Sequence, residues 1–513
     1  MASNRLIKPH FLTRLSAIFL PLLLLITMAS QAEPSKKPEV RVEKIVPEVV
    51  KTSHRFSIRN QKISYQAIAG ETLLEDDKGE QQASIFSITY LRDDIKDATK
   101  RPVTFIFNGG PGSASLWLHM GLFGPKRVVV PGDGQDDGAA PYRMEANEFS
   151  MLDESDLVFI DPVGTGFSRA LGEKKAADYW GVNEDAQSIA EFIRRWLIEH
   201  KRWNSPKYLA GESYGTTRAA ALVDELQGGW TDISVNGVML ISSILDFSHA
   251  RYQPGNHQPY IGFLPTMAAT AFYHNRVSDA DRALGLEQFV EQARQFAIKD
   301  YALALLQGSR LAEAEYQTVR TELARFTGLS EHYLDRVNLR VSASRYTKEL
   351  LRDQDLTVGR LDSRYTGKDY DSGGDSTDND PSGYGIDGAY TAAMHQYLYE
   401  DLGVKLSRPF NVLSTDVNRG WNWSVSGKQM HYVNVAPYLG QAQRENKDLR
   451  IFVGNGYFDF ATPFFATENT FADNGIDNSR VTMHYYKAGH MMYVEPQSLA
   501  QLAKDIRDFY HPK

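Results

Sequence analysis

The sequence predicts an α/β fold with a mainly parallel central sheet. The first observation is a series of short apolar runs, each followed by a glycine-rich or polar loop: residues 103–107, 157–160, 208–210, 238–241, 449–453 and 481–486. Such runs are typical of strands buried on both faces. The second is that helical stretches such as residues 182–200 separate the runs, which favours parallel connections. The third is a strand-to-helix junction at residues 207–215 that sets a serine between glycines.

The N-terminus predicts export. Residues 1–32 carry three basic residues, then a short apolar run that Pro21 interrupts, and small residues before a cleavage position after Ala32. We expect a secretory signal peptide, with an uncleaved N-terminal anchor as the alternative, and hence a periplasmic or secreted bacterial protein. Residues 33–51 are charged and aperiodic, which predicts a mobile leader.

Composition excludes several function classes. The formal net charge is −8 and no cluster of Lys and Arg interrupts it, so neither nucleic acid nor anionic lipid is an expected partner. Cysteine is absent, which excludes disulfides, a thiol nucleophile and cysteine-ligated metal. No later segment is apolar enough to cross a membrane, so we expect no stable membrane insertion after signal removal. Composition makes no prediction of oligomeric state.

The first ordered element is predicted to be an antiparallel hairpin. Residues 61–69 and 83–91 alternate apolar with polar side chains around a turn-like acidic segment. Together with the parallel strands and a closing helix at 496–510, this hairpin defines a core of residues 52–247 and 391–513.

Residues 248–390 are predicted to be a helical cap inserted into this core. The strand–helix alternation disappears there, and apolar residues share one helical face: Phe289, Ala293, Phe296 and Ala297. An ordered insertion of this length favours a cap over the active face. Its Gly/Asp/Ser loop at 369–380 invites a calcium interpretation, but Ala389 stands where an EF-hand needs its glutamate, so we expect a solvated surface loop.

Ser213 is the candidate nucleophile. It lies in Gly-Glu-Ser-Tyr-Gly, directly after an apolar strand and before an alanine-rich helical run at 216–226. The flanking glycines allow the sharp strand-to-helix turn that exposes a serine oxygen. Because the motif also arises by chance, interpretation as a hydrolase requires a base, an orienting acid and an oxyanion hole as well.

The loop after the strand at 103–107 is the candidate oxyanion hole. It reads Asn-Gly-Gly-Pro-Gly and lacks the lysine of a phosphate-binding loop. In an α/β hydrolase, this loop and the residue after the nucleophile each donate one backbone N–H to the oxyanion. Gly110 and Tyr214 are the two predicted donors.

Asp459 and His490 are the candidate acid and base. Each follows a predicted strand at its carboxyl end, where catalytic groups collect in α/β sheets. The chain order Ser213, Asp459, His490 is that of the α/β-hydrolase triad, which predicts that fold. Each residue has an alternative interpretation when it is considered alone: Asp459 as a helix cap, and His490 as an ordinary loop histidine. His484 lies within a strand and is expected to pack.

Five blocks of the sequence resemble the signature blocks of the serine carboxypeptidase family: residues 108–115, 161–168, 211–215, 456–459 and 489–491. The resemblance implies removal of C-terminal residues from peptides by acyl-enzyme chemistry, without metal or cofactor. It also implies that peptides with a free C-terminus are the partners.

The resemblance implies further binding roles. Asn108, the backbone of Gly109 and a protonated Glu212 would hold the substrate's terminal carboxylate, since two charged carboxylates cannot share a contact; this favours acidic pH. Met491 and Trp117 are candidates for the pocket of the leaving residue, with core packing as the alternative for both.

Two departures from the family pattern stand out. Leu122 occupies the place where many relatives carry a glutamate that shares a proton with the glutamate beside the serine, and desolvation of Glu212 is then the alternative means of keeping it protonated. The cysteines of eukaryotic relatives are absent. An esterase or acyltransferase on the same triad, and a catalytically silent binding protein, remain as alternative functions.

Overall fold

The computed structural model describes residues 44–511 except 136–137, 229–231, 426–427 and 430–431. The chain divides into two compact units, Met1–Lys44 and Ile45–Lys513. The predicted signal peptide (1–32) and most of the predicted leader (33–51) lie outside the described residues.

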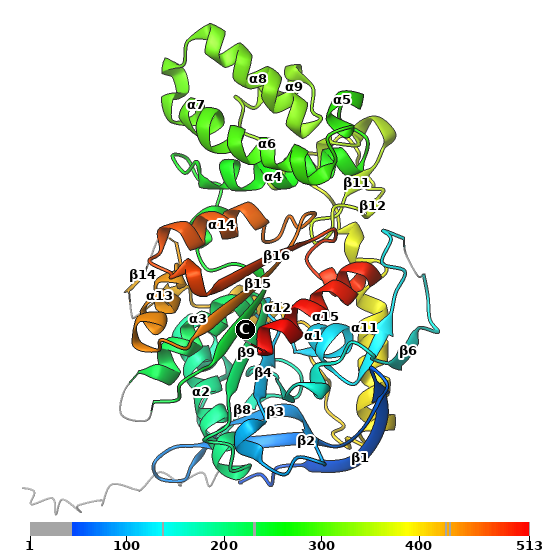
Figure 1. Cartoon of the computed structure of the whole chain (residues 1–513), viewed down its shortest axis with the longest axis vertical. Helices are drawn as coiled ribbons and strands as arrows, with labels where there is room; N and C mark the ends of the chain where they lie inside the picture. Colours follow the sequence, from blue (N-terminus) through cyan, green and yellow to red (C-terminus); the bar gives the residue numbers. More distant parts are fainter. Residues whose placement is uncertain (1–43, 136–137, 229–231, 426–427, 430–431, 512–513) are drawn as a thin grey trace, which may run out of the picture. The chain divides into compact units, whose positions relative to one another are not determined.

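One large mixed sheet organises this unit (Figure 1). Its strand order is β1 (Val49–Ile58), β2 (Gln61–Glu75), β3 (Gln81–Arg92), β7 (Asp156–Ile160), β4 (Val103–Phe107), β9 (Lys207–Ser213), β10 (Gly237–Ser243), β15 (Arg450–Gly456) and β16 (Val481–Tyr486), with β8 (Arg169–Ala170) paired to β3. Three further two-stranded sheets pair β5 (Lys126–Val129) with β6 (Arg143–Ala146), β11 (Thr357–Val358) with β12 (Thr366–Gly367), and β13 (Ser424–Val425) with β14 (Lys428–Gln429).

The predicted strand directions are confirmed. β2 and β3 form the antiparallel hairpin, and β3 also runs antiparallel to β7. From β7 onward, every neighbouring pair up to β16 is parallel. The predicted leader ends too late, however, because Val49 and Lys51 already pair with β2 as part of β1.

Helices cover both faces of the large sheet. On one face, α2 (Val182–Glu199), α3 (Tyr214–Gln227) and α13 (Ala436–Glu445) share a buried apolar cluster with the strands. On the other face, α15 (Pro496–Tyr510) and α11 (Asp387–Gln396) contribute to a second cluster. The two clusters are called the α3-side and α15-side clusters.

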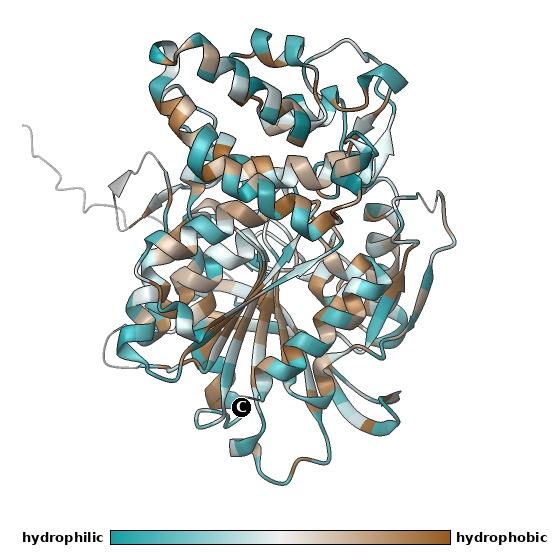
Figure 2. Cartoon of the chain, turned by 45° about the horizontal axis from the view of Figure 1, so that its top comes forward, coloured by the Kyte–Doolittle hydropathy of each residue, from teal (hydrophilic) through white to brown (hydrophobic). Residues whose placement is uncertain are grey.

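The parallel strands read as continuous apolar runs because both of their faces are covered. In β4, Phe105 belongs to the α3-side cluster and Ile106 to the α15-side cluster. Figure 2 shows these strands in brown between helices whose outer surfaces are largely teal. The carboxyl ends of the parallel strands therefore meet at one edge of a rigid sheet.

Residues 258–349 of the predicted insertion are mainly helical, whereas its predicted end at residue 390 falls inside α11, which packs in the α15-side cluster. The helices in this range are α4 (Gln258–Tyr273), α5 (Asp279–Arg282), α6 (Leu286–Phe296), α7 (Ala302–Gln307), α8 (Glu313–Thr327), α9 (Glu331–Arg336) and α10 (Ala343–Glu349). They surround a third apolar cluster, the cap cluster, in which the four residues predicted to share a face are all buried. α1 (Leu116–Leu118), α12 (Thr415–Gly420) and α14 (Phe464–Asp473) complete the helices, and α4 packs against α14 (Figure 1).

Candidate active site

Ser213 occupies a strained backbone turn between β9 and α3. Its φ of 60° and ψ of −129° lie in a region that L-residues rarely adopt. A side chain at Gly211 would bring its Cβ within 2.1 Å of the carbonyl oxygen of Gly215, and one at Gly215 would approach Phe107 O to 2.8 Å. Both glycines are therefore sterically required for this turn, which leaves Ser213 partly exposed at the sheet edge.

Asp459 and His490 meet at the same edge, in the loops that follow β15 and β16. The Nδ1 atom of His490 lies 2.7 Å from Oδ2 of Asp459, and both side chains are buried. Burial alone would lower the pKa of His490, but the charge of Asp459 and the hydrogen bond to it outweigh burial, and the pKa is raised. The pair thus has the geometry of a base and its orienting acid.

Asp459 is fixed by its own loop as well. Its Oδ1 accepts hydrogen bonds from the backbone N–H groups of Ala461 at 2.7 Å and Thr462 at 3.0 Å. Its Oδ2, the oxygen that faces His490, also accepts the Thr462 hydroxyl at 2.6 Å. Sequence reasoning missed Thr462, although a hydroxyl three residues after an aspartate is a recognisable local signal.

Strand β10, the neighbour of β9, links Ser213 to the loop that carries His490. Ser243 pairs with Ser213 in the β9–β10 register, and the hydroxyl of Ser242 donates to the carbonyl oxygen of His490 at 2.6 Å. Ser242 holds this position with a φ of 52°. In the described part of the chain, the structure records a hydrogen bond for the His490–Asp459 pair and none between Ser213 Oγ and His490.

The predicted oxyanion donors come from two loops in contact. Tyr214 begins α3, so its N–H is one of the helix N–H groups without an intrahelical acceptor. A Cβ at Gly109 would lie 2.5 Å from the nitrogen of Tyr214, so the loop after β4 passes directly against the start of α3. Gly110, with a φ of 102°, is exposed beside this contact. The loop that carries Gly110 therefore lies beside the helix start that carries the Tyr214 N–H.

Glu212 is a buried carboxyl group next to the nucleophile. Its Oε2 accepts the side-chain amide of Asn108, and the hydroxyl of Tyr493 lies 2.9 Å from Oε2 and 3.0 Å from Oε1. Burial raises its pKa to about 7, against the opposing effects of His490, Tyr493 and Asn108. Glu212 is consequently protonated in a large part of the molecules near neutrality, and able to donate a hydrogen bond.

Asn108 is fixed at every polar atom that faces the protein. Its Oδ1 accepts the N–H of Leu118 at 3.1 Å, while its backbone oxygen accepts the guanidinium of Arg218. Arg218 is itself fully buried and pairs with Asp185 at 2.6 Å. This network aligns the amide of Asn108 with Glu212.

Tyr493 is a residue that sequence reasoning missed. Leu122, which stands in place of the family's glutamate, is fully buried in the α15-side cluster. Its neighbour Gly121 makes room for Tyr493, because a Cβ there would lie 2.3 Å from the tyrosine ring. The tyrosine hydroxyl thereby reaches Glu212 from the histidine loop. The only sequence signal was a tyrosine three residues after His490.

Trp117 and Met491 lie on the α15 side of the site. Both are partly buried against the α15-side cluster, and the indole N–H of Trp117 donates to Ser113 Oγ at 2.9 Å. The structure therefore gives both residues a packing role and leaves part of each side chain accessible.

Two aspartates of the acidic loop at 369–380 bind other residues of the insertion. Asp369 accepts Lys348 at 2.5 Å, and Asp380 accepts the backbone N–H groups of Arg360 and Leu361. Within the described ranges, no group of three or more His, Asp or Glu residues is placed to hold a metal ion.

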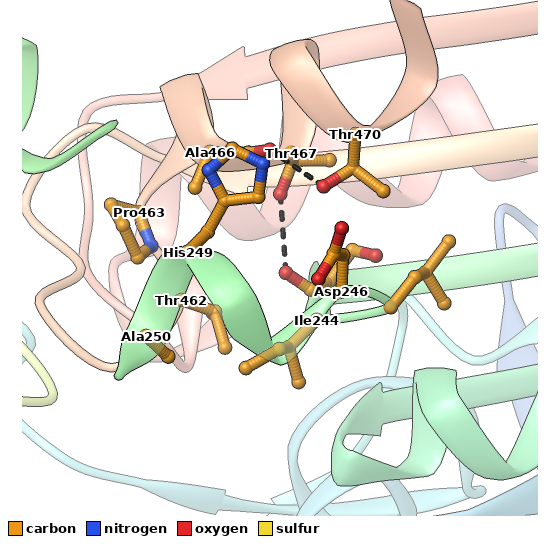
Figure 3. Close-up of a pocket in the computed structure, with 11 residues that line it drawn as sticks. Ile244, Asp246, His249, Ala250, Thr462, Pro463, Ala466, Thr467 and Thr470 are labelled. Atoms are coloured by element: carbon orange, nitrogen blue, oxygen red, sulfur yellow. Dashed lines mark hydrogen bonds between the residues drawn. The ribbon is translucent and has the colours of Figure 1, made fainter. Parts of the chain in front are cut away.

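A small pocket lies behind the loop of Asp459 (Figure 3). It is lined by Asp246, His249, Thr462, Thr467 and Thr470 among others, and its volume of about 10 Å³ is room for one water molecule. Figure 3 shows Thr467 bonded toward the end of β10, where it donates to Ser243 O at 3.1 Å. A peptide does not fit in a pocket of this size.

None of the helices in the described ranges is both long enough and apolar enough to span a bilayer.

Comparison with known sequences relates this site to one family. The family model for serine carboxypeptidases matches residues 77–503. Two similar proteins of Arabidopsis thaliana are serine carboxypeptidase-like 9, 29% identical over 153 residues (29% of this chain and 33% of the relative), and serine carboxypeptidase-like 5, 32% identical over 132 residues (25% and 28%). The chain spans about a third of the length of the curated relatives it matches.

Among solved structures, the chain is similar to Kex1Δp, a prohormone-processing carboxypeptidase from Saccharomyces cerevisiae. The TM-score is 0.55 at 16% identity, with 87% of this chain and 91% of that one covered. At this identity the likeness concerns the fold, and it confirms the predicted α/β-hydrolase architecture. Because the family model matches most of the sequence, the chain belongs to the serine carboxypeptidase family.

Proposed function

We propose that this protein is a serine-type carboxypeptidase that removes C-terminal residues from peptides. The observation that carries the proposal is the position of the buried carboxyl group of Glu212, whose pKa burial raises to about 7, directly beside a strained serine and a paired histidine. A triad alone supports any acyl transfer, whereas a neutral carboxylic acid beside it supports recognition of a negatively charged chain end.

The proposed cycle forms and then hydrolyses an acyl enzyme. Nε2 of His490 takes the hydroxyl proton of Ser213 as Oγ attacks the last peptide carbonyl, and Asp459 stabilises the resulting imidazolium. The carbonyl oxygen becomes anionic and accepts hydrogen bonds from the N–H groups of Gly110 and Tyr214. His490 then gives its proton to the departing amine. Next, His490 takes a proton from a water molecule that attacks the acyl carbonyl, and it returns this proton to Ser213 Oγ as the shortened peptide leaves.

Recognition of the leaving residue is proposed to depend on the proton of Glu212. Protonated Glu212 donates to the substrate's terminal carboxylate, alongside Asn108 and the N–H of Gly109. Above a pH of about 7, Glu212 loses that proton, and two carboxylates then repel each other at hydrogen-bond distance. Cleavage of substrates with a free C-terminus should therefore decline above this pH.

The test compares three substrates with the same acyl part. The protein should cleave an N-blocked dipeptide acid, and it should cleave the corresponding C-terminal amide at least tenfold more slowly. It should also cleave the methyl ester of the same acyl part, because ester hydrolysis needs the triad alone. The Ser213→Ala variant should lose all three activities by a factor of about 10⁴ or more. Equal cleavage of acid and amide would refute carboxylate recognition, and undiminished turnover by Ser213→Ala would refute the triad.

We further propose that the protein is exported from a bacterial cell, to the periplasm or the medium. The basic, apolar and small-residue segments of residues 1–32 support this proposal. Mass spectrometry of the mature protein from fractionated cells should find a new N-terminus at Glu33 outside the cytoplasm. An intact N-terminus in the cytoplasmic fraction would contradict export.

A further inference from the structure

Residues 360–363 of the insertion, called the bridging segment, lie between the two catalytic loops. The backbone oxygen of Arg360 accepts the N–H of Phe460 at 2.9 Å, one residue after Asp459. The oxygen of Leu361 accepts the N–H of His490 at 2.6 Å. These bonds place the backbone of the bridging segment in direct contact with both halves of the acid–base pair.

The side chain of Arg360 leaves the bridging segment toward solvent. It is exposed, and among the described residues no carboxylate lies within ion-pair distance of its guanidinium. Two acids of this part of the chain have other partners: Asp362 pairs with Arg364 at 2.6 Å, and Asp380 accepts the backbone N–H groups of Arg360 and Leu361. The protein thus presents a cation beside its active site without an internal counter-ion.

The charge of Arg360 acts on the site. After the larger effects of burial and Asp459, its positive charge lowers the pKa of His490. The backbone bonds of Arg360 and Leu361 to Phe460 and His490 place the start of this side chain beside the acid–base pair. A charge near enough to act on His490 is also near enough to act on a peptide bound over it.

The side of the site follows from the apolar clusters. Trp117 and Met491, beside the proposed position of the leaving residue, pack on the α15-side cluster. Phe460, which bonds to Arg360, belongs instead to the cap cluster. The residues beside the proposed leaving-residue site and the residue bonded to the backbone of Arg360 therefore pack in different regions.

We propose that Arg360 is a specificity-determining residue that pairs with an acidic side chain on the acyl side of the scissile bond. The protein would then prefer peptides that carry Asp or Glu just before the residue removed. This inference rests on the proposed function, since it concerns the acyl part of the same substrate. It adds a charge preference that the triad and the carboxylate-binding residues do not supply.

The experiment compares N-blocked dipeptide acids that differ only in Glu against Gln before a common C-terminal residue. The wild-type ratio of kcat/KM for Glu over Gln should be about threefold to tenfold and should shrink as salt is raised. The Glu/Gln ratio should fall to about one in Arg360→Gln and remain above one in Arg360→Lys. In Arg360→Glu it should drop below one, and a substrate with Lys before the C-terminal residue should be cleaved faster than the Gln substrate. The substituted side chain is exposed and the bridging hydrogen bonds use backbone atoms, so these variants should fold.

The matched control is Arg336→Gln, an exposed arginine at the end of α9 that gives the same change in net charge. It should keep the wild-type Glu/Gln ratio. An equal fall in this control, or a wild-type ratio of one, would overturn the assignment. So would a charge preference that appears only when the acidic side chain is on the leaving residue.

Failure of the proposed function has a different signature. If no dipeptide acid is cleaved, N-blocked Glu and Gln methyl esters present the same two acyl groups to the triad without a terminal carboxylate. A Glu/Gln ratio above one with the esters that disappears in Arg360→Gln supports the role of Arg360, and a ratio of one overturns it.

Discussion

Asp459 and Glu212 are both buried carboxyl groups that act on His490, yet the chain surrounds them differently. Asp459 faces three protein donors besides the imidazole: two backbone N–H groups and the hydroxyl of Thr462. Glu212 faces two, from Asn108 and Tyr493, and its burial raises its pKa to about 7. Because both groups are buried, the number of hydrogen-bond donors around each is what distinguishes the surroundings of Asp459 from those of Glu212.

The largest expected effect concerns the orienting carboxylate. Asp459→Asn should lower kcat by about 10⁴ for acid and ester substrates alike, because the amide stabilises the wrong tautomer of His490. Steady-state kinetics with both substrates check this. Asp353→Asn, which changes a surface ion pair with Arg276, is the control and should retain full activity. A loss confined to acid substrates would place Asp459 in binding.

The second prediction concerns the proton-donating carboxyl. In the wild type, kcat/KM for an acid substrate should fall about tenfold per pH unit above about 7, while the ester shows no such decline, since each unit removes nine-tenths of protonated Glu212. Glu212→Gln donates at every pH and should abolish this alkaline decline. At pH 9 the two proteins should differ by up to about 100-fold when each is normalised to pH 6. Persistence of the decline in the variant would assign it to another group.

A smaller effect is expected at the support of Asp459. Thr462→Val removes the hydroxyl donor at 2.6 Å and keeps both backbone donors, so kcat should fall by about tenfold for every substrate. Thr467→Val, which removes a donor to Ser243 O on the far side of the small pocket, is the matched control. If Thr462→Val instead altered the acid-to-ester ratio, the hydroxyl would be serving the leaving-residue site.

The smallest effect has an unexpected sign. Tyr493→Phe removes a hydrogen bond that lowers the pKa of Glu212, so that pKa should rise and the alkaline limb for acid substrates should move upward by about half a pH unit to one unit. A pH profile of kcat/KM measures the shift, with the ester profile as the internal reference. A downward shift would mean that the tyrosine stabilises the protonated form.

The sequence was sufficient for those parts of the site whose geometry is local. The glycines around Ser213 predicted the turn, and the strand-end positions of Asp459 and His490 predicted that the two meet, because parallel strands share one carboxyl edge. The parallel directions of these strands followed from the apolar runs, because strands that are buried on both faces are typical of parallel sheets.

The remaining contacts join segments far apart in the chain, and no local pattern encodes them. Tyr493 reaches Glu212 only because Gly121, on a different loop, leaves room for its ring. Ser242 of β10 bonds the backbone of His490 past the intervening strand β15, and Leu361 does so from the insertion. Each depends on tertiary packing, which residue spacing does not report.

The bridging segment has a consequence for how this molecule can be altered. Within residues 248–390, the backbone oxygens of Arg360 and Leu361 are the hydrogen-bond acceptors for the backbone N–H groups of Phe460 and His490. Splicing a short linker in place of the insertion would leave two buried amides in the catalytic centre without partners, at a cost of about 1–3 kcal/mol each. Removal of the insertion would therefore loosen the loops that carry Asp459 and His490.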